Sequence, residues 1–160
     1  MGKLFTEQFS FSASNSVVVI GLGRFGGAVA QSLVSLGHDV MGIDSDAEPV
    51  QLWADRLTHV VQADATNVMV MRQLGVADFK HAIIGIGDNL AASLMTLMAL
   101  TELGIPDIWV KALTEDHGRI AQRIGAQVLV DDRDRHLHAL AGVLGVGVPV
   151  GHDHAAVAVG

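Results

Sequence analysis

The sequence of 160 residues predicts a doubly wound α/β fold with a mostly parallel, six-stranded sheet in the order 3-2-1-4-5-6. Two observations lead to this prediction. Short runs of β-branched and other apolar residues alternate with longer segments of helical periodicity, and the alternation repeats along the chain. The first apolar run also leads straight into a glycine-rich turn and a helical pattern, which is the usual start of such a fold.

The first unit of this pattern contains the motif G-x-G-x-x-G. Residues 17–20 are four β-branched residues in a row, typical of a strand buried on both faces. In the turn that follows, Gly21 permits the sharp bend, Gly23 leaves room for a pyrophosphate, and Gly26 allows close packing of the next helix. The helical pattern is clear from residue 28 until Gly37 ends it. The unit therefore predicts a Rossmann-like nucleotide site, with phosphates at the helix N-terminus.

The second strand, expected over residues 39–44, ends in a carboxylate. Asp44 follows Gly26 at close to the spacing of about 20 residues that is typical of a ribose-binding acid. Such an acid accepts hydrogen bonds from ribose hydroxyls and repels a 2′-phosphate, so it disfavours NADP. Ser45 and Asp46 come next, before a helix expected over residues 48–55.

The remaining chain repeats the alternation of strands and helices. Strands are expected over residues 58–62, 82–87, 107–111 and 125–130, and helices over residues 68–74, 90–103, 115–123 and 134–144. Asp64 or Thr66 is the expected cap of the first of these helices, and Asp88 with Asn89 that of the second. The helix over 90–103 is apolar on nearly every side, which predicts a central helix with Met95 and Met98 as core filler.

In this topology, ligands bind at the carboxyl ends of the strands, where the strand order reverses. Several polar and glycine segments are expected to converge there. They are Gly21–Gly26, Asp44, Asp64–Thr66, Gly87–Asn89 and Lys111. Arg24, in the first turn of the phosphate-binding helix, and Lys111 would both favour extra phosphate charge. ADP or ATP is therefore as consistent with the sequence as NAD(H).

Composition and charge exclude several classes of protein. Half of the residues are hydrophobic and 17% are charged, which indicates a globular chain with a large core. The net charge of −7, without a basic stripe, argues against nucleic acid as a partner. The absence of cysteine excludes disulfides and thiolate metal sites. His136 and His138 would point to different sides of a helix, so no metal site is predicted. No apolar run reaches the ~20 residues of a membrane span, and a cytoplasmic location is expected.

The nucleotide-binding domain is expected to occupy residues 16–140, after a leader segment over 1–15 and before a Gly/Ala/Val-rich tail over 141–160. We see no second region that would hold a substrate, and no catalytic residues stand out. A role in binding or sensing is therefore favoured over catalysis. The alternative from another class is a small NAD-dependent oxidoreductase or a redox-sensing Rossmann protein.

Several segments together resemble the RCK domain, also called the TrkA-N family, and within it the KtrA-type cytosolic subunits of bacterial potassium uptake systems. The segments are Val19–Gly26, Asp44, Ala63–Thr66, Ile86–Asn89 and Ile108–Ala112. The resemblance covers about residues 16–130. It implies a non-enzymatic, cytosolic homodimer that assembles into a ring and binds ATP, ADP or NAD(H). It also implies a partner, a membrane-embedded potassium-translocating subunit that the ring gates.

The resemblance also assigns roles to individual residues. Arg24 resembles the arginine that reaches the terminal phosphate, and Asp44 the ribose acid. Asp64, Ala65 and Thr66 resemble the adenine-side loop, Gly87, Asn89 and Lys111 the remaining wall, and His117 a polar contact. The complete set of candidate binding residues is Gly21, Gly23, Arg24, Phe25, Gly26, Asp44, Ser45, Asp46, Asp64, Ala65, Thr66, Gly87, Asp88, Asn89, Lys111 and His117.

The sequence departs from the family's pattern in two places. Residues 131–133 read Asp-Asp-Arg where the family usually has a His-Pro-Glu turn, whose Glu approaches the nucleotide or its cation across the dimer. The tail over residues 141–160 does not resemble the C-terminal ligand-binding lobe of the family.

Overall fold

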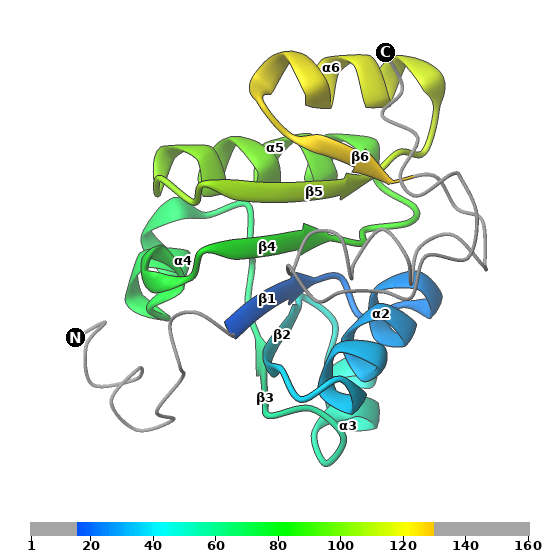
Figure 1. Cartoon of the computed structure of the whole chain (residues 1–160), viewed down its shortest axis with the longest axis vertical. Helices are drawn as coiled ribbons and strands as arrows, with labels where there is room; N and C mark the ends of the chain where they lie inside the picture. The colour runs from blue at the N-terminus through cyan, green and yellow to red at the C-terminus, as the bar shows by residue number, and fades with distance from the viewer. Residues whose placement is uncertain (1–15, 130–160) are drawn as a thin grey trace.

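The computed structural model describes residues 16–129, which form one sheet covered by helices on both faces. Six strands pair in parallel in the order β3-β2-β1-β4-β5-β6, which confirms the predicted fold class (Figure 1). The strands are β1 (Ser16–Ile20), β2 (Asp39–Asp44), β3 (His59–Gln62), β4 (His81–Ile84), β5 (Asp107–Lys111) and β6 (Gln127–Leu129). The helices are α2 (Arg24–Ser35), α3 (Ala47–Trp53), α4 (Val68–Gln73), α5 (Leu90–Glu102) and α6 (Glu115–Ile124), with the short 3-10 helix η1 (Val76–Asp78).

The two faces of the sheet pack into two separate cores. Successive strand side chains point to opposite faces, so Val18 and Ile20 of β1 enter one core while Val17 and Val19 enter the other. The first core packs against α4, α5 and α6, and the second against α2 and α3. All five residues of β1 are buried, because this central strand is covered on both sides.

One predicted boundary needed correction at the edge where the glycine turn lies. Helix α2 begins at Arg24, in agreement with the predicted place of this residue in the first turn, so the last glycine of the motif lies inside the helix. Strand β4 ends at Ile84, whereas the sequence predicted a strand to residue 87. Gly85 follows the strand and lies so close to Gly26 of α2 that a Cβ there would stand 2.9 Å from the Gly26 Cα, and residues 85–89 form a loop at the carboxyl edge.

The prediction that Met95 and Met98 fill the core was wrong. Their side chains are 52% and 61% exposed, whereas Leu97 and Leu100 of the same helix are fully buried. Helix α5 is apolar on nearly every side, so the pattern alone does not indicate which stripe faces the sheet. The structure shows that only the stripe with Leu97 and Leu100 does so.

Other sequence predictions fall on residues that the structure does not describe. These are the leader, the helix over 134–144, the residues Asp131-Asp132-Arg133 and the tail over 141–160. Among the helices of residues 16–129, none combines the length and the apolar character needed to cross a bilayer.

Candidate functional site

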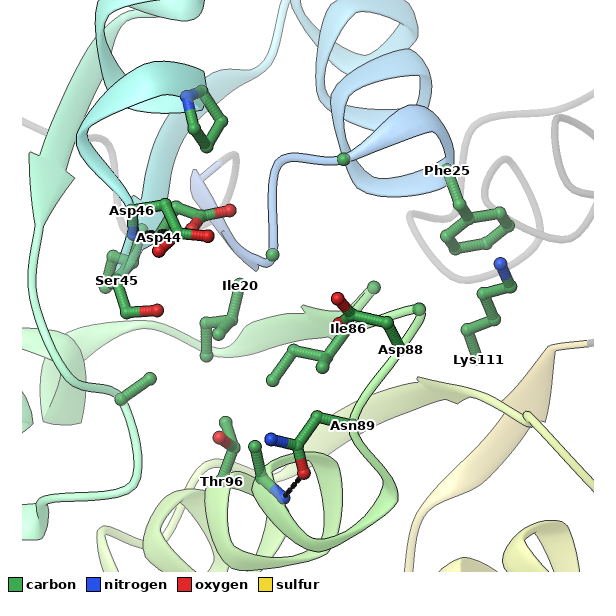
Figure 2. Close-up of a pocket in the computed structure, with 18 of the residues that line it drawn as sticks. Ile20, Phe25, Asp44, Ser45, Asp46, Ile86, Asp88, Asn89, Thr96 and Lys111 are labelled. Carbon is green, nitrogen blue, oxygen red and sulfur yellow. Dashed lines mark hydrogen bonds between the residues drawn. The ribbon is translucent and has the colours of Figure 1, made fainter.

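A cavity of about 1200 Å³ opens at the carboxyl edge of the sheet, above the ends of β1, β2 and β4. Its lining brings together all but two of the predicted binding residues, the exceptions being Gly26 and His117. Those that line it are Gly21, Gly23, Arg24, Phe25, Asp44, Ser45, Asp46, Asp64, Ala65, Thr66, Gly87, Asp88, Asn89 and Lys111. Figure 2 shows Asp44, Ser45 and Asp46 at one end of this cavity and Phe25 with Lys111 at the other.

The three glycines of the turn serve different purposes. Gly21 has a φ of +90°, and its N–H donates to the Ile43 carbonyl at 2.8 Å. A Cβ on Gly26 would overlap the Gly21 carbonyl, so Gly26 is required for the helix to lie against the turn. A Cβ on Gly23, in contrast, would meet nothing within 4 Å. The protein itself leaves that space open, as expected where a phosphate approaches the backbone.

Asp44 is held in place by hydrogen bonds from the backbone. Its Oδ2 accepts a hydrogen bond from the Leu22 N–H at 2.8 Å, and its Oδ1 accepts one from the Asp46 N–H at 2.9 Å. Each carboxylate oxygen can accept a further bond. The carboxylate therefore stands at the end of β2, attached to the glycine turn and oriented toward the cavity, where ribose hydroxyls would donate to it.

The loop after β3 has its own internal hydrogen bonds. Asp64 Oδ1 accepts from the Thr66 hydroxyl at 2.6 Å and from the Thr66 N–H at 3.0 Å. The prediction that Asp64 or Thr66 caps the following helix was wrong. Asn67 does so, because its Oδ1 accepts from the N–H groups of Met69 and Val70. Asp64 instead fixes the loop that forms this side of the cavity.

The opposite end of the cavity carries two cationic side chains. The Lys111 amine lies 5.2 Å from the centroid of the Phe25 ring, a cation–π geometry. Gly87 lies next to it, since a Cβ there would stand 3.7 Å from Lys111 Nζ. Arg24 is exposed and begins α2, at the positive end of the helix dipole. This end can therefore hold anionic groups.

The loop between β4 and α5 completes the wall. Asn89 caps α5, and its Oδ1 accepts from the Ala92 N–H at 2.9 Å (Figure 2). Of the two predicted caps, Asn89 is therefore the one with this role. Asp88 is exposed and lines the cavity.

His117 lies outside the cavity lining. Its ring is fully buried. Nδ1 accepts a hydrogen bond from the Leu113 N–H at 3.0 Å, and Nε2 lies 3.1 Å from the Ser93 hydroxyl oxygen. Since Nδ1 is an acceptor, Nε2 carries the proton and donates to Ser93. Burial lowers the pKa of His117. The structure therefore places it as a neutral link between α5 and the loop after β5.

Sequence reasoning missed several apolar residues and one hydroxyl of the lining. The apolar residues include Ile20, Ile43, Ala63, Ile86 and Ala92. Their positions at strand ends and in the first turn of α5 could have suggested them. The hydroxyl belongs to Thr96, which is fully buried, and its Oγ1 has no hydrogen-bond partner. No motif marks it. In the described part of the chain, no three His, Asp or Glu side chains group as metal ligands would.

Comparison with known proteins agrees with this geometry. The model of the TrkA-N domain matches residues 17–132, which span the glycine turn, Asp44 and every described strand beyond Ser16. The chain belongs to the TrkA-N domain family. It is 39% identical over 130 residues to the Ktr system potassium uptake protein A of Bacillus subtilis, covering 81% of this chain and 55% of that protein. It is 41% identical over 112 residues to the Ktr system potassium uptake protein C of the same organism, covering 70% and 51%. This TrkA-N chain thus spans about half the length of these relatives.

Two solved structures share the fold of this TrkA-N chain. One is the NAD(P)-binding domain of an exopolyphosphatase-related protein from Archaeoglobus fulgidus, with a TM-score of 0.65 and 22% identity, covering 81% of this chain and 96% of that one. The other is the GsuK channel bound to NAD, with a TM-score of 0.64 and 17% identity, covering 80% and 23%. At these identities the likeness concerns the fold alone.

Proposed function

We propose that this TrkA-N chain is a nucleotide-sensing regulatory component of a potassium uptake system. It binds ATP, ADP or NAD(H) in the cavity at the carboxyl edge and thereby gates a membrane potassium-translocating subunit. The shared cavity is the observation that carries the nucleotide site, because the glycine turn, the start of α2 and the Asp44 carboxylate line it together. A Cβ on Gly23 would meet nothing in the protein, so the backbone of the turn is open to a phosphate at this point.

The charge and the shape of the cavity support one arrangement of the base, the ribose and the phosphates of the nucleotide. The base lies against the apolar residues near β3 and α5, and the ribose hydroxyls donate to Asp44. The phosphates lie over the N-terminus of α2, between Gly23 and Arg24. Asp44 lies where a 2′-phosphate would stand, so NADP(H) binds more weakly than NAD(H).

The names of the relatives support the proposal that the partner is a membrane potassium-translocating subunit. Both Ktr proteins A and C are potassium uptake proteins, and GsuK is a channel whose structure holds NAD. We extend this role to the present chain, as a cytoplasmic homodimer that assembles into a ring on the membrane subunit. The role is regulatory and not enzymatic.

Calorimetric titration of the purified chain with AMP, ADP, ATP, NAD⁺, NADH and NADP⁺ tests the site. We expect binding of adenine nucleotides and NAD(H), and much weaker binding of NADP⁺. Equal affinity for NAD⁺ and NADP⁺ would contradict the role of Asp44. No binding of any of these ligands would refute the proposed function.

Ion flux tests the role in gating. The chain is reconstituted in liposomes with the potassium-translocating subunit encoded in the same genome, and rubidium uptake is measured with and without nucleotide. We expect uptake to depend on both the chain and the nucleotide. Turnover of NADH with simple carbonyl substrates at about 1 s⁻¹ or faster, by the chain alone, would favour the alternative of an oxidoreductase.

A further inference from the structure

Two carboxylates flank the glycine turn from opposite sides. Strand β1 pairs with β2 on one side and with β4 on the other. Asp44 ends β2, and Asp88 lies in the loop after β4. The turn of Gly21–Gly26 leaves the end of β1 between them. Figure 2 shows Asp44 and Asp88 on opposite sides of the cavity, with Ile20 between them.

This arrangement matches the chemistry of a dinucleotide. A dinucleotide has a central pyrophosphate with a ribose on each side, and each ribose carries a diol that donates hydrogen bonds. A carboxylate accepts hydrogen bonds only, so it suits a diol. With the pyrophosphate at the N-terminus of α2, one ribose faces Asp44 and the second faces the loop with Asp88.

The same arrangement is unfavourable for a nucleoside triphosphate. Its terminal phosphate extends from the α2 N-terminus toward the side where a second ribose would lie. The Asp88 carboxylate lines that side of the cavity, and two like charges repel. The Lys111 amine, 5.2 Å from the Phe25 ring, offsets part of this repulsion. The end of the cavity opposite Asp44 thus carries both signs of charge and is not a purely cationic phosphate site.

We propose that Asp88 sets the ligand preference of this cavity. It accepts hydrogen bonds from the second ribose of a dinucleotide and disfavours the terminal phosphates of ATP. This inference rests on the proposed function, because it concerns the same nucleotide site. NAD(H) is then the preferred ligand among the nucleotides that fit the glycine turn, Asp44 and Arg24.

The substitution Asp88→Asn tests the proposal, since it keeps the size of the side chain and removes its charge. Three probes are titrated without magnesium: ADP-ribose, ATP and AMP. ADP-ribose carries the second ribose without the nicotinamide, ATP carries the terminal phosphates, and AMP carries neither. We expect ADP-ribose to bind about tenfold more weakly to the variant, and ATP about three- to tenfold more tightly. AMP should bind as it does to the unmodified chain.

A matched control separates local from general charge effects. Asp78→Asn removes the same charge from an exposed position outside the cavity lining. It should leave the affinities for all three probes unchanged. An unaltered ratio of ADP-ribose to ATP affinity in Asp88→Asn would overturn the inference, as would an equal loss for AMP. If the unmodified chain binds none of the probes, the proposed function itself fails.

Discussion

The Asp44 carboxylate accepts a hydrogen bond from the Leu22 N–H at 2.8 Å, so the acid at the end of β2 is attached to the turn after β1. A buried N–H that loses its partner costs about 1–3 kcal/mol. Leu22 is 1% exposed, so the loss of this bond leaves its N–H without a replacement. The acid thus contributes to the stability of the turn, in addition to its proposed role in ligand recognition.

We therefore predict that Asp44→Ala lowers the free energy of unfolding by about 1–2 kcal/mol and weakens every ligand that has a free ribose diol. Urea denaturation and calorimetry measure the two effects. Asp44→Asn keeps one acceptor oxygen and should be less destabilising. If Asp44→Ala unfolds at the same urea concentration as the unmodified chain, the bond to Leu22 carries no net stability.

The glycines of the turn should respond differently to the same substitution. Gly26→Ala places a Cβ against the Gly21 carbonyl, so we expect a large loss of stability or failure to fold. Gly23→Ala places its Cβ in open space and should alter the free energy of unfolding by less than about 1 kcal/mol. It should nevertheless abolish nucleotide binding. A Gly23→Ala variant that still binds would show that no phosphate occupies this space.

Arg24 is exposed at the start of α2, so its removal should affect ligands and not the core. We predict that Arg24→Ala weakens ATP binding by about ten- to a hundredfold, as expected for the loss of a charge-assisted hydrogen bond. The affinity for ADP should fall less and that for AMP least. The variant Arg24→Lys should recover part of the affinity for ATP. Equal losses for ATP and ADP in titrations would mean that Arg24 does not reach the terminal phosphate.

The buried histidine predicts a pH dependence of stability. Burial lowers the pKa of His117 in the folded protein below its usual value near 6.5. The unfolded chain therefore takes up the proton first as the pH falls, and stability declines below about pH 6.5. Protonation of Nδ1 would also remove the acceptor for the Leu113 N–H. His59 has a pKa lowered by burial too, so it adds to the same decline.

Denaturation between pH 8 and about pH 5.5 measures this effect. His117→Asn, which keeps an acceptor oxygen near the Leu113 N–H, should be less stable at pH 8 but lose less stability on acidification. The variant His59→Asn measures in the same way how much of the loss of stability on acidification comes from His59. If the free energy of unfolding depends on pH with the same slope in His117→Asn and in the unmodified chain, His117 does not cause the loss of stability at low pH.

The sequence predicted the sheet and most of the cavity because local patterns encode both. Buried parallel strands require continuous apolar runs, and the turn requires glycine for backbone reasons. The position of Asp44 follows from the length of the unit before it. These constraints act over short stretches of chain, so they can be recognised in the sequence without knowledge of how the elements pack.

The errors have a different origin, since they depend on which groups meet in three dimensions. Helix α5 presents several equivalent apolar stripes, so the exposure of Met95 and Met98 depends on how the helix docks. His117 and Thr96 are polar residues on helices, and the pattern does not indicate that one pairs with Ser93 while the other lines the cavity. Asn67 was overlooked because two other residues nearby could also cap α4.

Gly21, Gly26 and Gly85 lie backbone against backbone, and a Cβ at any of these positions would stand too close to the backbone of a neighbour. The bend beneath the cavity therefore tolerates no side chain. The side chains of Arg24, Asp88 and Lys111, which line the same cavity, are under no such constraint. The charge of the cavity can therefore be redesigned at these three positions without rebuilding the bend.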